Sequence, residues 1–226
     1  MINNSSDQRS LEWYRVRFGH ITGSEVHKLM SLPRKKDELF TDTARSYLYQ
    51  IAAERTFNPD FLADDDIFQD YLDQTSFVTR AMQWGIDQEA AARRLYADLQ
   101  GGVEVLEVSS CPHDDIQGFA ASPDGIVRLP EQRCLEIKCP SLATHMRYVA
   151  EIHDAASLKR VKPEYYWQVQ AEMSCTGLSS ADFVSYCAWL SRPIHIVNIP
   201  RSPDDVALLE ERVRLADGFI NNIINQ

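Results

Sequence analysis

The stretch Ala121–Pro140 reads ASPDGIVRLPEQRCLEIKCP and combines a Pro-Asp-Gly turn with two short apolar runs. Turn residues between runs rich in Ile, Val and Leu are typical of neighbouring β-strands. Along a strand the side chains alternate between two faces, so Leu135 and Ile137 share one face while Glu136 and Lys138 share the other. The run CLEIKC therefore places a carboxylate and an ammonium group side by side.

Asp124, Glu136 and Lys138 allow two interpretations. An isolated Glu-x-Lys is commonly a surface ion pair on a half-buried strand. Antiparallel pairing of the two strands, however, would bring the turn that carries Asp124 close to the strand that carries Glu136, so that both carboxylates could share a hard cation. Mg²⁺ prefers oxygen ligands, and the Ile137 carbonyl is a third candidate. A lysine beside such ions suits phosphodiester hydrolysis, because it can orient or deprotonate the attacking water.

Outward from this stretch, the chain alternates between helical and strand patterns. Helices are predicted at residues 11–19, 23–29, 79–99, 163–175 and 203–224. Strands are predicted at residues 103–109, 118–122, 125–129, 134–139, 181–190 and 194–199. The second helix is predicted to begin with a capping box formed by Thr22 and Glu25. The acidic stretch 58–74 is interpreted as a loop or short helices. This order predicts an α/β (α+β) fold with a central mixed β-sheet flanked by helices.

The composition fits one cytoplasmic, soluble domain. The chain has 226 residues, 44% of them hydrophobic, which is enough for one well-packed core. No run approaches the ~18 consecutive apolar residues of a membrane span, and the polar start MINNSSDQRS has no signal-peptide core. The five cysteines form no CxxC pair, which favours buried free thiols over disulfides or zinc ligands.

The net charge argues at first against a nucleic-acid partner. The chain has 23 Lys and Arg against 33 Asp and Glu, a formal charge of -10. Much of the excess acid lies in DDDIFQDYLDQ, whereas basic residues gather in RSLEWYRVRFGH, PRKK and KRVK. A local basic channel would allow DNA binding, although a solvated surface explains each of these runs equally well.

Three further motifs occur along the chain together with Pro123-Asp124 and the run EIKCP. They are WYRVRFGHITGSEV at residues 13–26, MQWGIDQE at residues 82–89 and YYWQVQAEM at residues 165–173. Together these motifs resemble the phage lambda exonuclease or YqaJ-like viral recombinase family, within the PD-(D/E)xK nuclease superfamily. The resemblance implies a restriction-endonuclease-like core and a single nuclease domain over residues 1–226.

The same resemblance implies which residues carry the chemistry. Asp124, Glu136 and the Ile137 carbonyl would bind one metal ion, and Glu89 would approach a second. Lys138 would be the catalytic lysine, and Gln168 would position the water or the scissile phosphate. From the residues alone, a solvated helical charge explains Glu89 and a polar helix position explains Gln168. The ions would be two Mg²⁺ per site, with Mn²⁺ as the alternative.

A second group of residues is implied to hold the DNA end. Arg17, Ser24 and Ser122 match positions that bind a terminal 5′-phosphate, and Ser24 is expected in the first turn of a helix, where free N–H groups favour anions. Met82 matches an apolar wedge that parts the strands, although a core methionine is an equally good interpretation. The remaining candidates are placed along the incoming duplex: Arg34, Lys35 and Lys36.

The function that the resemblance implies is a Mg²⁺-dependent 5′-to-3′ exonuclease on linear double-stranded DNA. It would prefer 5′-phosphorylated ends, release 5′-mononucleotides and leave a 3′ single strand for phage-type recombination. A single-strand annealing protein would be its partner, a homotrimeric ring its assembly and a phage or prophage its source. The alternatives are another PD-(D/E)xK nuclease (an endonuclease, or a Cas4-like or RecB-like enzyme) and a catalytically silent DNA-end-binding module.

Overall fold

The main sheet is built around the strands that follow Asp124. The computed structural model describes residues 8–35, 37–75, 79–128 and 131–226. In it, β5 (Gly125–Arg128) and β6 (Arg133–Lys138) pair antiparallel, with Gly125 opposite Leu135. The remaining strands of this sheet are β2 (Glu104–Leu106), β7 (Ser180–Tyr186) and β8 (Ile194–Pro200), and the order is β2-β5-β6-β7-β8.

This five-stranded sheet is mixed, as predicted. The β6–β7 pair is parallel, whereas β2–β5, β5–β6 and β7–β8 are antiparallel. Two of the predicted strands are shorter than expected, because 103–109 ends at Leu106 and 181–190 ends at Tyr186.

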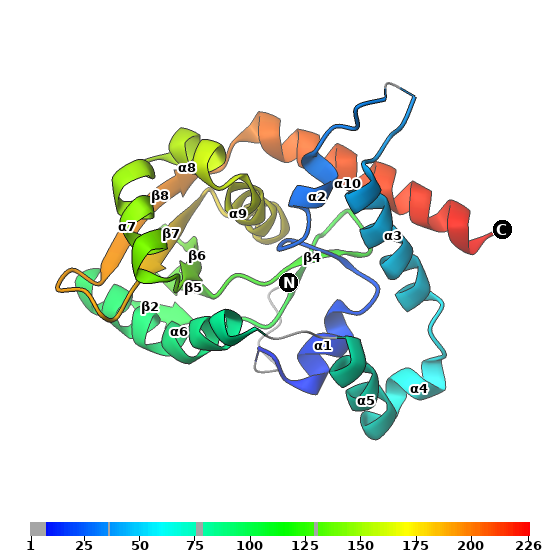
Figure 1. Cartoon of the computed structure of the whole chain (residues 1–226), viewed down its shortest axis with the longest axis horizontal. Helices are drawn as coiled ribbons and strands as arrows, with labels where there is room; N and C mark the ends of the chain where they lie inside the picture. The colour runs from blue at the N-terminus through cyan, green and yellow to red at the C-terminus, as the bar shows by residue number, and fades with distance from the viewer. Residues whose placement is uncertain (1–7, 36, 76–78, 129–130) are drawn as a thin grey trace.

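Helices cover both faces of the main sheet (Figure 1). α6 (Arg80–Leu99) lies on one face, where Ala92 and Tyr96 pack against Leu135 and Ile137 of β6. The other face is covered by α7 (Leu142–Glu151), α8 (Ala155–Val161) and α9 (Pro163–Thr176). β6 is therefore a central strand that is buried on both of its faces.

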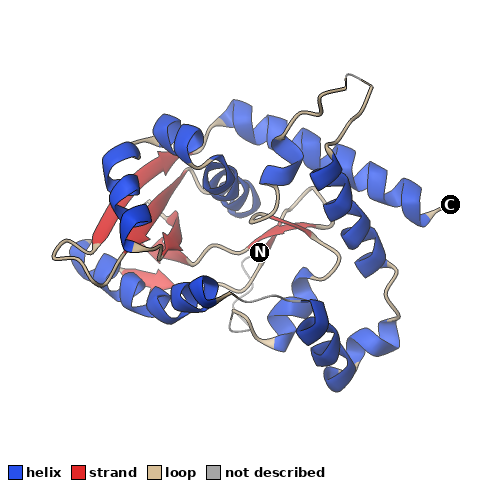
Figure 2. Cartoon of the chain, in the orientation of Figure 1, coloured by secondary structure: helices blue, strands red, loops and turns tan. Residues whose placement is uncertain are grey.

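A second, three-stranded sheet stands beside the first (Figure 2). It consists of β1 (Ile21–Thr22), β4 (Phe119–Ala121) and β3 (Cys111–Pro112), in that order, with β1 and β4 parallel. The predicted strand 118–122 thus belongs to a different sheet from the predicted strand 125–129. Residues Ser122 to Asp124 carry the chain from one sheet to the other.

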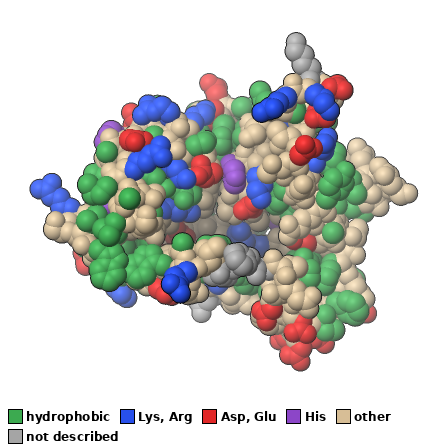
Figure 3. All heavy atoms as spheres, viewed as in Figure 1, with side chains coloured by type: hydrophobic (Ala, Val, Ile, Leu, Met, Phe, Trp, Pro, Cys, Tyr) green, Lys and Arg blue, Asp and Glu red, His purple; other side chains and the backbone are tan. Residues whose placement is uncertain are grey.

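The remaining helices surround the small sheet. They are α1 (Leu11–Arg17), α2 (His27–Met30), α3 (Asp42–Arg55), α4 (Pro59–Ala63), α5 (Asp65–Thr75) and α10 (Pro203–Ile224). α4 and α5 confirm the interpretation of the acidic stretch as short helices. In the space-filling view, acidic side chains gather over these two helices (Figure 3).

The predicted capping box at Thr22 is wrong. Thr22 is the last residue of β1, and its backbone N–H donates a hydrogen bond to the hydroxyl of Tyr47. The next backbone N–H, that of Gly23, is bonded to the Ala120 carbonyl in the small sheet. α2 begins only at His27, and its N-cap, Val26, makes no side-chain cap. Because Thr22 pairs with β4, the helix cannot begin there. α2 is therefore only one turn long, from His27 to Met30.

The cysteine prediction is confirmed, because all five cysteines are free: Cys111, Cys134, Cys175 and Cys187 are buried and Cys139 is half-buried. Within the described residues, no helix combines the length and the apolar character needed to span a bilayer.

Candidate active site

The turn before β5 places Asp124 against the next strand. Its Oδ2 accepts a hydrogen bond of 2.7 Å from the backbone N–H of Ile137 in β6. This contact follows from the antiparallel register, in which the first residue of β5 lies opposite Leu135. The expectation that the turn carries Asp124 to the strand with Glu136 and Lys138 is thus confirmed.

Glu136, Lys138 and Gln168 form one polar cluster on the α9 side of β6. Lys138 Nζ lies 2.5 Å from Glu136 Oε1 and donates to Gln168 Oε1 at 3.3 Å. Gln168 Nε2 donates to Glu136 Oε1 at 2.6 Å. The alternative of a surface ion pair is wrong, because the Glu136 side chain is only 1% exposed. Glu136 and Lys138 share one face of β6 because side chains alternate along the strand. Helices cover this face as well as the other, so the Glu136–Lys138 pair is enclosed.

A further acidic residue, Glu172, joins this cluster from α9. It lies one turn after Gln168, whose Nε2 donates to Glu172 Oε1 at 3.2 Å. The second carboxylate oxygens of Glu136 and Glu172 are both buried without a hydrogen-bond partner in the described part of the chain. Three carboxyl groups, those of Asp124, Glu136 and Glu172, therefore lie in one enclosed region with a single ammonium among them.

The pKa values of these groups respond to this crowding. Burial, and then the charges of Glu136 and Glu89, raise the pKa of Asp124 well above its ordinary value. Burial and the charge of Glu136 raise that of Glu172 in the same way. Burial alone would lower the pKa of Lys138, but the charges of Glu136 and Asp124 outweigh it and raise it. Burial and crowding thus favour the protonated forms of Asp124 and Glu172, and an added cation would stabilise their ionised forms.

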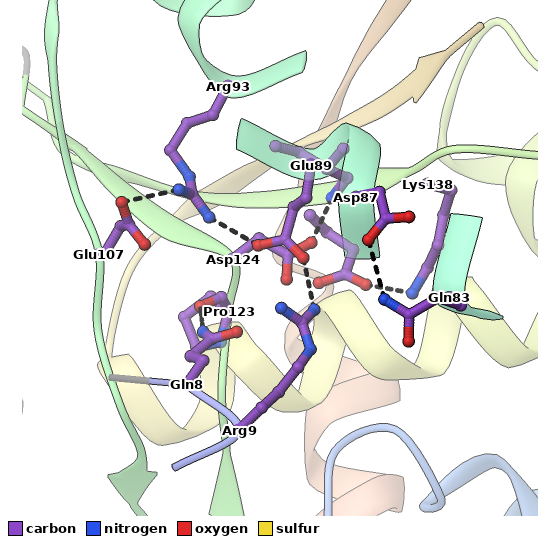
Figure 4. Close-up of polar contacts among 12 residues, drawn as sticks. Gln8, Arg9, Gln83, Asp87, Glu89, Arg93, Glu107, Pro123, Asp124 and Lys138 are labelled. Carbon is purple, nitrogen blue, oxygen red and sulfur yellow. Dashed lines mark hydrogen bonds and ion pairs between the residues drawn. The ribbon is translucent and has the colours of Figure 1, made fainter. Parts of the chain in front are cut away.

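Glu89 enters the site from α6 between two guanidinium groups (Figure 4). Its Oε2 lies 2.5 Å from Arg9 Nη2 and its Oε1 lies 2.6 Å from Arg93 Nη2. Arg93 also binds Glu107 Oε1 at 2.7 Å. Glu89 is 8% exposed, so the interpretation of a solvated helical charge is wrong.

Arg17 and Ser122 meet at the other side of the site. Arg17 Nη1 donates to Ser122 Oγ at 2.7 Å, and the guanidinium lies 4.2 Å from the ring centroid of Trp13. Burial lowers the pKa of Arg17 to about 10, so it remains charged at neutral pH. Ser24 is exposed in the turn before α2, and the expectation that it lies in the first turn of a helix is wrong.

One cavity of about 530 Å³ joins these groups. Ten of the predicted residues line it: Asp124, Glu136, Ile137, Lys138, Gln168, Glu89, Arg17, Ser24, Ser122 and Met82. Figure 3 shows the molecule hollowed near its centre, between the side of α6 and the side of α1 and α3. Met82 is 54% exposed, so the interpretation of a core methionine is wrong.

The predicted duplex-tracking residues lie elsewhere. Arg34 and Lys35 are exposed in the segment between α2 and α3 and do not line the cavity. Lys35 instead binds Glu38 at 3.1 Å. Lys36 lies outside the described residues.

Three residues of the site were missed by reasoning from the sequence. Glu172 and Arg93 each follow a predicted site residue by four positions on a helix, a spacing that places side chains on the same face and could have revealed both. Arg9 gave no such signal, because its contact with Glu89 joins segments 80 positions apart.

The oxygen-rich donor set fits a hard divalent cation. The orphaned oxygens of Glu136 and Glu172 and the raised pKa of Asp124 all indicate carboxylates that lack a counter-charge. Among the described residues, no three acidic, His or Cys side chains are already arranged around one point. Each proposed carboxylate ligand instead contacts a positive group or an N–H donor. Asp124 accepts from the Ile137 N–H, Glu136 pairs with Lys138, and Glu89 pairs with Arg9.

A mixed sheet whose β5–β6 pair brings Asp124, Glu136 and Lys138 into one cavity defines a fold of the restriction-endonuclease-like class. Residues 12–179 match the model of the YqaJ-like viral recombinase domain, and the chain belongs to that family, as its motifs predicted.

Solved structures agree with this assignment. An alkaline exonuclease from Laribacter hongkongensis (LHK-Exo) superposes with a TM-score of 0.75 at 29% identity, over 96% of this chain and 95% of that one. The complex of LHK-Exo with dAMP gives a TM-score of 0.74 at the same identity and coverage. A phage-related exonuclease from Haemophilus somnus 129PT shares the fold, with a TM-score of 0.65 at 17% identity over 91% of this chain and 95% of that one. Among curated protein sequences, none is significantly similar.

Proposed function

We propose that the protein is a Mg²⁺-dependent 5′-to-3′ exonuclease that degrades one strand of linear double-stranded DNA. One observation carries the proposal: a single cavity holds the carboxylates, Lys138 and Gln168 together with the Arg17–Ser122 pair. The first group suits phosphodiester hydrolysis and the second suits a terminal phosphate. The exonuclease activity named for the Laribacter hongkongensis relative, which covers nearly the whole chain, supports the same reaction class.

The metal ligands in this proposal are Asp124, Glu136, the Ile137 carbonyl and Glu89. Two ions are proposed per site, Mg²⁺ or alternatively Mn²⁺, because both take oxygen ligands. When bound, such ions polarise the phosphoryl oxygens, lower the pKa of the attacking water and stabilise the leaving oxygen.

Lys138 is proposed to orient the attacking water and, once bound cations have lowered its pKa so that Nζ is a neutral amine, to accept a proton from that water. Its ammonium is fixed by Glu136 Oε1, by Gln168 Oε1 and by the ring of Tyr165, whose centroid lies 4.8 Å away. Nearby cations would lower the pKa that Glu136 and Asp124 now raise. Gln168 holds this arrangement, because its amide contacts both Lys138 and Glu136 and so keeps the two aligned.

Arg17, Ser122 and Ser24 are proposed to bind the terminal 5′-phosphate. A guanidinium can donate two hydrogen bonds to phosphate oxygens, and the two hydroxyl groups can donate further ones. Each cleavage would leave a new 5′-phosphate able to enter the same pocket, which explains movement in the 5′-to-3′ direction. Met82, which lines the cavity, is proposed to part the strands as an apolar wedge.

The product and partners complete the proposal. Release of 5′-mononucleotides is supported by the capture of dAMP by the related LHK-Exo. The surviving 3′ strand would pass to a phage single-strand annealing protein, which fits a viral recombinase family. A homotrimeric ring would keep the enzyme on DNA, and light scattering of the purified protein would test for three copies.

The test uses linear duplexes with a 5′-phosphate or a 5′-hydroxyl, and closed circular plasmid, each with and without Mg²⁺. We expect loss of linear DNA only, faster with the phosphate and dependent on the metal. Cutting of the circle would instead indicate an endonuclease, and DNA binding without any Mg²⁺-dependent loss would indicate an end-binding module. Either result would overturn the proposal.

A further inference from the structure

Arg9 occupies one oxygen of a carboxylate that the proposed function assigns to a metal ion. Its Nη2 lies 2.5 Å from Glu89 Oε2, and both residues line the active-site cavity (Figure 4). The other oxygen of Glu89 is bound by Arg93. With a guanidinium on each oxygen, a cation that ligates Glu89 would lie next to one of these positive charges, and repulsion between them favours release of that guanidinium.

The backbone around Arg9 is held in place at the site. The preceding side chain, Gln8, donates from Nε2 to the carbonyls of Val108 and Pro123, both at 2.9 Å. The following residue, Ser10, caps α1 through the backbone N–H of Trp13. Arg9 itself has a φ of 69°, a left-handed conformation that is unfavourable for a residue with a Cβ atom. Residues in such conformations cluster at functional sites, where surrounding contacts such as those of Gln8 and Ser10 hold them.

The two guanidinium groups on Glu89 differ in how firmly they are held. Arg93 is 12% exposed and has a second ion pair with Glu107. Arg9 is 36% exposed, and in the described part of the chain Glu89 is its one partner. The weaker restraint on Arg9 makes it the group that an arriving cation displaces.

We propose that Arg9 is an exchangeable counter-ion: it neutralises Glu89 in the metal-free site and moves to a DNA phosphate when a divalent cation takes its place. This inference rests on the proposed function. A displaced Arg9 would remain in the cavity that also contains Arg17 and Ser122, where a phosphate would be its natural partner. Metal binding and DNA binding would then be coupled, since each favours the position of Arg9 that the other requires.

The first test measures metal binding without turnover. Free Mn²⁺ is titrated by electron paramagnetic resonance against the wild type, Arg9→Gln, Arg9→Lys and the control Arg128→Gln. The control removes the same charge from a 52% exposed side chain at the far end of β5. We expect Arg9→Gln to bind the weaker of two ions roughly tenfold more tightly, the gain from removing one charged hydrogen bond. Arg9→Lys and Arg128→Gln should stay near the wild type.

The second test measures DNA binding by fluorescence anisotropy of a 5′-phosphorylated duplex over a range of salt concentrations. With Ca²⁺ filling the oxygen sites, Arg9→Gln should lower the slope of log affinity against log salt by about one, the loss of one phosphate contact. In EDTA the slopes should agree, because Arg9 then stays on Glu89.

The outcomes separate this inference from the proposed function. A wild type that binds no divalent cation contradicts the proposed function itself. A wild type that binds two ions, with Arg9→Gln binding them equally well or showing an unchanged salt slope in Ca²⁺, contradicts the exchange of Arg9 alone. Thermal melts of each variant confirm that the chain is folded.

Discussion

Lys138 is the residue on which the proposed chemistry depends most. Its ammonium contacts Glu136 and Gln168 inside the cavity, and its backbone lies at the end of β6, where it pairs with Ser185 of β7. A group that moves a proton in the transition state contributes typically about 10²–10⁴-fold to the rate.

Lys138→Ala should therefore lose at least about 100-fold in cleavage rate while it still binds DNA and divalent cations. Single-turnover cleavage of a 5′-phosphorylated duplex measures the rate, and anisotropy measures DNA binding. Arg147→Ala, on the exposed side of α7, is the control and should cleave normally. Turnover of Lys138→Ala close to that of the wild type would refute the assigned role.

Glu172 should make the stability of the metal-free protein depend on pH. Burial and the charge of Glu136 raise its pKa above the ordinary 4.5, so the folded protein holds a proton that the unfolded chain releases. Stability should then fall as the pH rises from about 4.5 toward the raised pKa, since the unfolded state binds fewer protons in that window. Asp124 contributes with the same sign.

Glu172→Gln removes this proton and should be more stable than the wild type at pH 8 in EDTA, with the difference vanishing near pH 4. Urea melts at both pH values measure it. Glu210→Gln is a control of opposite sign, because hydrogen bonds from Ser174 and His113 outweigh burial and lower the pKa of Glu210. The Glu210→Gln variant should be less stable than the wild type at pH 8, and this difference should disappear in acid. Equal stabilities of Glu172→Gln and wild type at pH 8 would count against the account.

At the scale of elements, the strands around Asp124 were predictable and their burial was not. The turn, the alternation in β6 and the antiparallel pairing all follow from local sequence, and these features bring Asp124 to Ile137. That α7, α8 and α9 cover the second face of β6 depends on contacts between distant segments. Glu136 was therefore assignable to a face of β6, but its burial was not predictable.

The errors in the helices have the same origin. Thr22 and Glu25 have the residue types of a capping box, but strand pairing with β4 outweighs this local preference. α3 and α7 begin at good N-caps, Thr41 and Ser141, which the sequence displayed and the prediction did not use. Arg9 is a different case, because only the folded chain brings it to Glu89.

Close packing between β5 and β2 restrains Gly125, the first residue of the β5–β6 hairpin. A Cβ atom on Gly125 would lie 2.5 Å from Val105 Cγ1, too close unless the Val105 side chain or one of the strands shifts. Gly125→Ala should lower the free energy of unfolding by about 1–3 kcal/mol and also reduce cleavage, because Asp124 is the preceding residue.

Gly218→Ala is the matched control for this change. It lies in the interior of α10 with open space around its Cβ position, so it should stabilise the protein by about 0.5–1 kcal/mol. Denaturant unfolding compares the two variants. A Gly125→Ala protein as stable as the wild type would show that the hairpin tolerates the added methyl group.

At the scale of the whole molecule, the formal charge of -10 conceals a division of charge. Acidic side chains gather over α4 and α5 (Figure 3), whereas Arg9 and Arg17 line the active-site cavity. Overall charge therefore did not predict the partner. The same cavity also holds Asp124, Glu136 and Glu89, so bound cations would have to offset these carboxylates before DNA could approach. The central claim is that this one cavity would both bind the DNA end and cut the strand.

The most direct test of that claim compares cleavage of 5′-phosphorylated and 5′-hydroxyl duplexes by the wild type and by Arg17→Gln. The account predicts that the wild type prefers the phosphate and that Arg17→Gln cuts both ends at the same reduced rate, because the guanidinium beside Ser122 is gone while Lys138 and the carboxylates remain. An Arg17→Gln protein that keeps the full preference for the phosphorylated end would contradict it.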